Sequence, residues 1–168
     1  MKPSIFFFAA VILVEPVYAA PDKRIVDSCL ATEAVVPSIR YAKLNPTNYY
    51  EEDDSGTTSN TFKFEGGEIG TWESSKGKNF GLIYKGRKLR KQDFIKLGAE
   101  QPSSFDLTLA QWGIVVAAKE KYLCTAFNFE GLGQSGSFQN IRGVYIIDTK
   151  SRPTKAYYVV GDVRNVSK

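Results

Sequence analysis

The sequence predicts a mainly β protein: an antiparallel sheet, arranged as a sandwich or a partly closed barrel, with a C-terminal meander and one N-terminal α-helix. Short runs of β-branched and aromatic residues, separated by Gly and Pro, fill the chain from residue 62 onward. Two of these runs, residues 114–118 and 144–147, are apolar on both strand faces, so each requires cover on both sides. Only residues 22–36 show a sustained helical period.

The first 19 residues have the pattern of a secretory signal peptide. Lys2 supplies a positive charge, and residues 5–14 form an unbroken apolar stretch that is too short to cross a bilayer as a helix. Small or tolerated residues at 17–19 predict cleavage after Ala19, which leaves residues 20–168 as a single domain. The alternative is an uncleaved N-terminal anchor. We therefore expect a periplasmic or secreted protein that does not span a membrane.

The predicted helix over residues 22–36 begins at Asp22, a good N-cap residue, and ends before Pro37. Its apolar residues at three- and four-residue intervals include Cys29, which we expect to face the sheet. The only other cysteine is Cys124. An isolated pair of cysteines in an oxidising compartment predicts a disulfide, and its spacing suits neither a redox CxxC motif nor a zinc site.

Residues 41–60 combine turn formers and charges without an apolar period, and they predict a long exposed loop. Residues 93–97 predict a helical turn that ends at Gly98. Turns are expected at residues 85–86, 119–121 and 151–153. The predicted strands cover residues 62–64, 69–72, 80–84, 87–91, 105–109, 112–118, 122–129, 143–148 and 155–163.

The composition excludes several classes of function. The chain has no histidine, so it lacks the commonest general base and the commonest metal ligand. A net charge of +4 is too mild for a dedicated nucleic-acid binder. Carboxylates such as Glu65 with Glu68, or Asp106 with Glu130, belong to no motif that would place them together, and no GxSxG elbow is present. We expect a non-enzymatic protein without metal or cofactor.

The glycine-rich segment at residues 131–137 is the predicted functional loop, because it joins two well-defined strands and its glycines leave the backbone open to a partner. The alternative is a strand connection without a role. The residues expected to contact a partner are Gly133, Gln134, Ser135, Gly136, Ser137 and Phe138.

Ser135-Gly136-Ser137 resembles, over these residues alone, the serine-glycine loop that periplasmic inhibitors of c-type lysozyme insert into the enzyme's cleft. In that family a basic residue and a tyrosine continue the loop, whereas Phe138 and Gln139 follow here. The cysteine pattern also differs, so we do not assign the chain to that family. The resemblance implies only that a rigid sheet can present a small-residue loop to an active-site groove.

Two charged clusters and several aromatic residues complete the candidates. Residues 51–54 are four carboxylates that predict either simple solvation or an electropositive protein partner, and their contiguous spacing does not suit calcium. The basic residues 85–91 predict either an anionic partner or a charged edge strand that prevents aggregation. Four aromatic residues are candidates for stacking on sugars, and the commoner alternative is packing in the core or at its rim: Tyr49, Tyr50, Trp72 and Trp112.

Together these features favour an exported protein-binding module, such as an inhibitor or immunity protein that neutralises a cell-envelope hydrolase. A carbohydrate- or envelope-binding accessory domain is the alternative, and a histidine-free hydrolase is a third. The sequence identifies neither the partner nor the oligomeric state.

Overall fold

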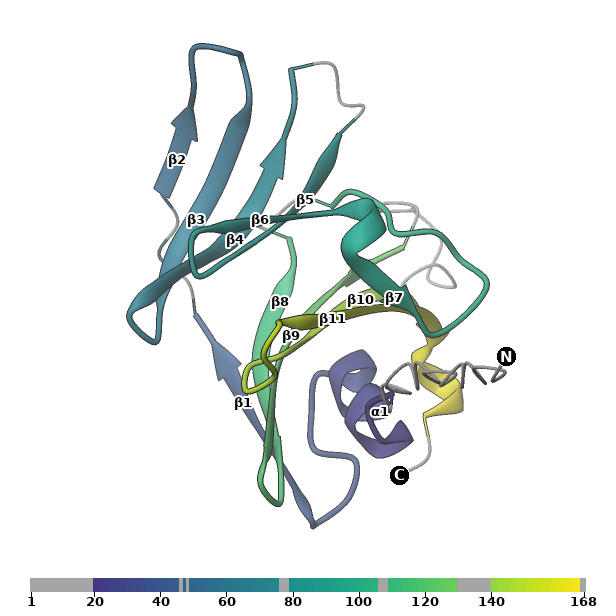
Figure 1. Cartoon of the computed structure of the whole chain (residues 1–168). Coiled ribbons are helices and arrows are strands. Elements are labelled where there is room, and N and C mark those ends of the chain that lie inside the picture. The colour runs from purple at the N-terminus through teal and green to yellow at the C-terminus, as the bar shows by residue number, and fades with distance from the viewer. Residues whose placement is uncertain are drawn as a thin grey trace, which may run out of the picture.

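Two β-sheets and one α-helix make up the fold in the computed structural model, which describes residues 20–45, 47, 49–75, 79–105, 109–129 and 140–166 (Figure 1). The six-stranded sheet, here called sheet A, has the order β1-β8-β9-β10-β11-β7. Its strands are β1 (Ile39–Leu44), β8 (Gln111–Ala117), β9 (Glu120–Asn128), β10 (Ile141–Asp148), β11 (Lys155–Asp162) and β7 (Phe94–Lys96). The five-stranded sheet B runs in chain order through β2 (Tyr49–Glu52), β3 (Thr58–Phe64), β4 (Gly67–Glu73), β5 (Phe80–Tyr84) and β6 (Arg87–Arg90).

All described strand pairs are antiparallel except β7 with β11. Among the described strands, β1 and β7 form the edges of sheet A, and β2 and β6 form the edges of sheet B. The predicted mainly β fold with one helix is confirmed, and of the two predicted arrangements the sandwich is observed.

Sheet A is covered on both faces, by helix α1 (Lys23–Ala31) on one side and by sheet B on the other (Figure 1). Strand β10 shows how this works, because successive side chains of a strand point to opposite faces. Val144 and Ile146 pack with the helix, whereas Tyr145 and Ile147 pack with sheet B. The double cover expected for residues 114–118 and 144–147 is confirmed except at Ala118, which is exposed in the turn after β8.

The helix begins where predicted, since the Asp22 carboxylate accepts a hydrogen bond from the backbone N–H of Arg24 at 2.8 Å. The predicted end before Pro37 is wrong, because the helix ends at Ala31. Thr32 adopts a left-handed conformation (φ 57°) and its N–H bonds the Ser28 carbonyl. Arg142 of β10 also donates to the Leu30 carbonyl at 2.8 Å, which places a cation at the C-terminal end of the helix.

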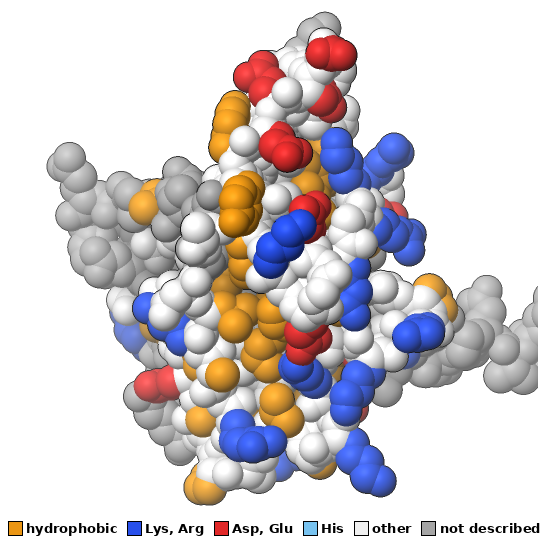
Figure 2. All heavy atoms as spheres, turned by 90° about the vertical axis from the view of Figure 1, so that its left-hand side faces the viewer, with side chains coloured by type: hydrophobic (Ala, Val, Ile, Leu, Met, Phe, Trp, Pro, Cys, Tyr) orange, Lys and Arg blue, Asp and Glu red, His pale blue; other side chains and the backbone are white. Residues whose placement is uncertain are grey.

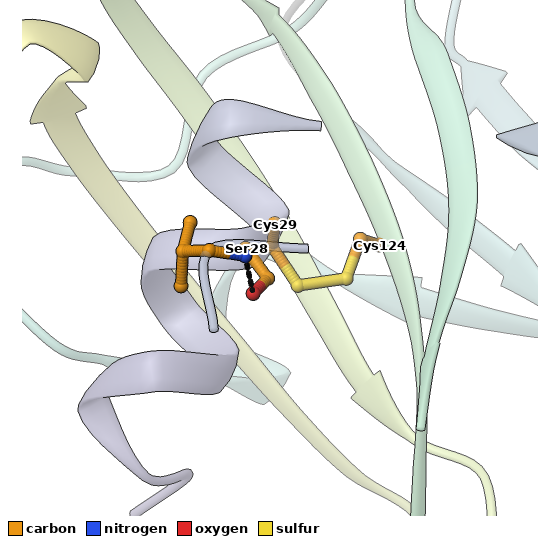
Figure 3. Close-up of a disulfide and its surroundings, with 4 residues drawn as sticks. Ser28, Cys29 and Cys124 are labelled. Atoms are coloured by element: carbon orange, nitrogen blue, oxygen red, sulfur yellow. Dashed lines mark hydrogen bonds between the residues drawn. A yellow bond between two sulfur atoms is a disulfide. The ribbon is translucent and has the colours of Figure 1, made fainter. Parts of the chain in front are cut away.

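Cys29 and Cys124 form the predicted disulfide, with their Cα atoms 5.5 Å apart (Figure 3). Both cysteines are fully buried between the helix and sheet A. The neighbouring Ser28 hydroxyl accepts a hydrogen bond from the Val35 N–H at 3.4 Å, which holds the chain that leaves the helix. The cross-link therefore fastens the helix to the middle of sheet A.

The long loop predicted over residues 41–60 is wrong, because this segment contains most of β1, all of β2 and the start of β3. Strand β2 has four exposed residues and therefore no apolar period, yet it pairs with β3, with Tyr49 opposite Thr61 and Glu52 opposite Thr58. Its conformation is decided by a partner strand and not by local pattern.

The helical turn expected at residues 93–97 is also wrong. A single 3₁₀ turn, η1 (Lys91–Asp93), comes first, and Phe94 then starts β7 with its side chain buried in the core. The Asp93 carboxylate accepts the Arg90 N–H at 2.7 Å, which ends β6. The turn between β8 and β9 is Ala118-Lys119, so Glu120 and Lys121, which were expected in the turn, belong to β9.

The strand predicted over residues 105–109 is not observed at its described ends, since Phe105 and Leu109 lie outside any strand. Residues 106–108 are outside the described residues. The other eight predicted strands are confirmed, and apart from the start of β3 their ends differ by no more than two residues.

Candidate functional site

The inward face of sheet B changes from apolar to polar along β3 and β4. Nearest the core, the cross-strand row contains Phe62, Ile69 and Tyr84, all buried against sheet A. Two residues further along each strand, Asn60 lies opposite Thr71. The last row is Thr58, Glu73 and Phe80. On β5, Leu82 lies opposite Thr71 and is buried in the core, so the polar positions of this face belong to β3 and β4. Figure 1 shows that the strands of sheet B extend past sheet A.

A cleft of about 150 Å³ lies against this polar end of sheet B. Its wall comes from β2 to β5, and its other side is formed by Ser104, Phe105 and Tyr145. Five lining residues are aromatic, and Glu73 is the only charged residue among the described residues that line it. The full lining is Tyr50, Thr58, Ser59, Asn60, Thr71, Trp72, Glu73, Phe80, Gly81, Ser104, Phe105 and Tyr145.

The side of the cleft formed by sheet A and its preceding loop is held in place by ring contacts and hydrogen bonds. The Tyr145 hydroxyl donates to the Ser103 carbonyl at 2.6 Å, and burial raises the pKa of this phenol, which keeps it neutral. The Phe105 ring stacks on the Phe127 ring with 4.5 Å between centroids and lies 5.7 Å from the Tyr145 ring. This side of the cleft is thus preformed.

The electrostatic character of the cleft is negative. Glu73 is exposed at its rim, and Asn60 in its wall has a carboxamide oxygen that is enclosed and accepts no hydrogen bond from the described residues. An acceptor without a donor leaves its partial negative charge uncompensated. The faces of the aromatic rings are also electron-rich.

The free edge strand β2 borders this cleft. Tyr49 and Tyr50 are 56% and 65% exposed, which makes them two of four large hydrophobic residues exposed in the described chain. Residues 51–54 follow, and all four carboxylates are exposed, as predicted. Figure 2 shows acidic side chains gathered at the tip of this edge with hydrophobic side chains next to them. We call residues 49–54 the acidic edge.

Within the acidic edge, Asp53 has a structural role. Its carboxylate accepts hydrogen bonds from the Ser55 hydroxyl and from the Ser55 and Thr57 backbone N–H groups. The Ser55 hydroxyl and the Thr57 N–H are the main causes that lower the pKa of Asp53. Asp53 therefore shapes the β2–β3 turn. Among the described residues, Glu51, Glu52 and Asp54 form no ion pair, although the charge of Glu51 helps to raise the pKa of Lys63.

The opposite edge of sheet B, strand β6, is basic. Arg87, Lys88 and Arg90 are exposed, whereas Leu89 points inward and is buried. Because successive side chains of a strand point to opposite faces, the basic residues of β6 do not all lie on one face. Its position at a sheet edge agrees with the interpretation of a charged edge strand that prevents aggregation.

The candidate tryptophans and the candidate glutamates near the β3–β4 turn make internal contacts. Trp112 is buried in the core, and Trp72 is 8% exposed with its indole N–H bonded to the Leu89 carbonyl, so neither offers a free face to a sugar. Glu65 forms an ion pair with Lys121, and Glu68 forms one with Lys63.

The predicted contact residues Gly133, Gln134, Ser135, Gly136, Ser137 and Phe138 lie outside the described residues, as do Asp106 and Glu130. The base of that loop is described: the Phe129 N–H donates to the Ile141 carbonyl at 3.0 Å. Phe127, two residues before Phe129, stacks on the cleft residue Phe105. The strands that carry the loop therefore end beside the cleft.

Sequence reasoning missed the cleft itself. Asn60 and Thr71 occupy strand positions whose side chains face inward, where an apolar residue is expected. This break in alternation at the ends of β3 and β4 was the available signal. The segments that complete the cleft are distant in sequence.

Comparisons with protein-family models, curated proteins and solved structures found no match to this chain. No helix in the described part of the chain has both the length and the hydropathy of a membrane span. No group of three or more potential metal ligands gathers among the described residues. The class that the fold and site define is a disulfide-linked β-sandwich with one covering helix and a small aromatic, negatively charged cleft.

Proposed function

We propose that this chain is an exported protein-binding module whose acidic edge docks on an electropositive surface of a partner protein. The module acts without catalysis, as an inhibitor or immunity protein that neutralises a cell-envelope hydrolase. The observation that carries the proposal is the pair of exposed tyrosines, Tyr49 and Tyr50, next to exposed carboxylates on the strand at one edge of sheet B.

A free edge strand is well suited to a protein partner. No described strand pairs with the outward backbone N–H and C=O groups of β2, and an extended segment of a partner can satisfy them. Tyrosine is enriched in protein interfaces. The carboxylates of Glu51 and Glu52 add charge complementarity, which speeds association with a basic surface and excludes acidic ones.

The same geometry argues against a carbohydrate platform. Tyr49 and Tyr50 are consecutive in a strand, so their rings point to opposite faces of sheet B. Tyr50 faces the cleft and Tyr49 the other side. The two rings therefore cannot lie under one sugar chain as a common stacking surface.

The test is a pull-down from periplasmic or secreted extract with the oxidised protein as bait. We expect one stoichiometric protein that is retained by the wild type and lost by the Tyr49→Ser/Tyr50→Ser variant. Ile95→Ser is the matched control, because Ile95 is an exposed apolar residue on the edge strand β7 of the other sheet. Retention on peptidoglycan or polysaccharide in place of a protein, or turnover of a labelled cell-wall substrate, would contradict the proposal.

The loop prediction is tested with the same bait. Replacing Ser135-Gly136-Ser137 with bulky residues is expected to abolish capture and leave the melting temperature unchanged, because the strands at its base are already joined by the Phe129–Ile141 hydrogen bond. Capture that survives this replacement but not the tyrosine variant confines binding to the acidic edge.

A further inference from the structure

We infer that the cleft beside the acidic edge binds a guanidinium group, supplied by an arginine side chain of the partner protein. The inference rests on the proposed function and adds to it the chemistry of one central contact. Three properties of the cleft support it: its volume, its charge and its aromatic lining.

The volume of the cleft fits a single side chain. Drug-sized ligands and cofactors occupy pockets of about 300–1,000 Å³. The cleft measures about 150 Å³, a size comparable to engineered cavities that hold one benzene molecule. It is therefore too small for an oligosaccharide or a nucleotide, and it matches one planar end group with the start of its aliphatic stem.

The negative charge and the aromatic rings of the cleft favour a bound cation. Glu73 is the one charged residue among the described lining residues, and the enclosed Asn60 oxygen adds an uncompensated dipole. Rings of Tyr50, Phe80 and Phe105 also line the cleft. Aromatic faces combined with a carboxylate attract cations, most strongly where water is partly excluded.

Guanidinium fits this lining better than ammonium. It is flat, stacks on aromatic faces, is more weakly hydrated and carries five donors for several acceptors at once. The acceptors available around the cleft include the Glu73 carboxylate and the hydroxyls of Thr58 and Thr71. The lysine ammonium is a compact, strongly hydrated charge that does not stack on aromatic rings and lacks the planar set of donors of a guanidinium.

The cleft also lies where an interface needs an anchor. Tyr50 belongs both to the cleft lining and to the exposed acidic edge, so a strand docked on β2 lies next to a residue that lines the cleft. Binding energy in protein interfaces concentrates in a few central residues, among which Arg, Tyr and Trp are enriched. A partner arginine beside Tyr50 is such a contact.

The test uses small probes and needs no identified partner. N-acetyl-arginine methylamide is titrated into the oxidised ¹⁵N-labelled protein, and backbone amide shifts of Thr71 and Glu73 are followed by NMR. We expect saturable shifts at these residues. The citrulline analogue has nearly the same shape without the charge, and the lysine analogue has the charge without the plane. Each is expected to bind at least roughly fivefold more weakly than the arginine compound.

Glu73→Gln is expected to weaken the arginine compound by roughly fivefold to tenfold. Glu68→Gln is the matched control, because it removes the same charge from the same strand β4 at its other end, where Glu68 pairs with Lys63. It should leave the affinity unchanged. Phe80→Leu should weaken binding while the citrulline and arginine compounds become more alike.

Shifts that do not saturate, equal binding of the citrulline or lysine compound, or an unchanged affinity in Glu73→Gln would each overturn the inference. Its failure is distinguishable from failure of the proposed function. If the Glu73→Gln variant binds the protein partner with unchanged affinity and Tyr49→Ser alone, which leaves the cleft residue Tyr50 in place, abolishes capture, the acidic edge binds a partner without an arginine in the cleft.

Discussion

The disulfide between Cys29 and Cys124 offers the most quantitative prediction. It closes a loop of 95 residues and fastens the helix to sheet A. In the chain-entropy description, a cross-link of this span removes denatured-state freedom equivalent to about 4 to 5 kcal/mol at 25 °C. For a domain of this size, that loss corresponds to a fall in melting temperature of roughly 10–20 °C.

Reduction should also affect one part of the fold first. Helix α1 has nine residues, and a helix this short is not stable by itself in water. Its attachment depends on the buried side chains of Ile25, Cys29 and Leu30 and on the cross-link. We therefore expect amide protection of the helix to be lost before that of β9 and β10, which lie within sheet A.

The assay is thermal and urea denaturation of the wild type with and without reductant, next to the Cys29→Ala/Cys124→Ala double variant. The wild type should lose stability on reduction, and the double variant should be insensitive to reductant. Hydrogen exchange under the same conditions locates the first region to open. A wild-type melting temperature that is the same in oxidising and reducing buffer would refute the reasoning.

Three further predictions follow from local geometry. Gly143→Ala should lower the free energy of unfolding by about 1–3 kcal/mol, since a Cβ there would lie 2.4 Å from the Phe127 ring; Gly98→Ala, where the space is open, should not. A urea titration of both variants checks this, and equal stability would contradict it. Asp22 accepts hydrogen bonds from the Arg24 guanidinium and backbone N–H, which lower its pKa to about 2. The stabilisation from Asp22 is therefore complete above the ordinary pKa of aspartate and is lost as the pH falls towards 2. In Asp22→Asn, the free energy of unfolding should fall less steeply with decreasing pH in the acid range. An unchanged pH dependence would count against Asp22 as a stabilising cap. Calcium should leave the melting temperature unchanged, because Glu51 and Glu52 point to opposite faces of β2 and the Asp53 carboxylate is engaged in the turn. A rise of several degrees would show a calcium site.

Much of this protein is determined by local sequence. Hydrophobic runs bounded by Gly and Pro gave the positions of eight strands, because a buried strand needs apolar side chains wherever its face meets the core. The N-cap at Asp22 could be assigned because the cap interaction involves residues adjacent in sequence. The disulfide between Cys29 and Cys124 could be predicted because the chain has only two cysteines and is expected to be exported.

Other features were decided by the tertiary structure alone. Strand β2 is exposed along its whole length, so it has no apolar period, and only pairing with β3 makes it a strand. The helix ends early partly because Arg142, far away in sequence, bonds its last turn. The cleft combines Asn60, Glu73 and Phe105 with a tyrosine from β10, and no local pattern links segments so far apart. Periodicity reports whether a residue faces the core, but which surfaces meet, and which polar side chains they enclose between them, depends on how the two sheets stack.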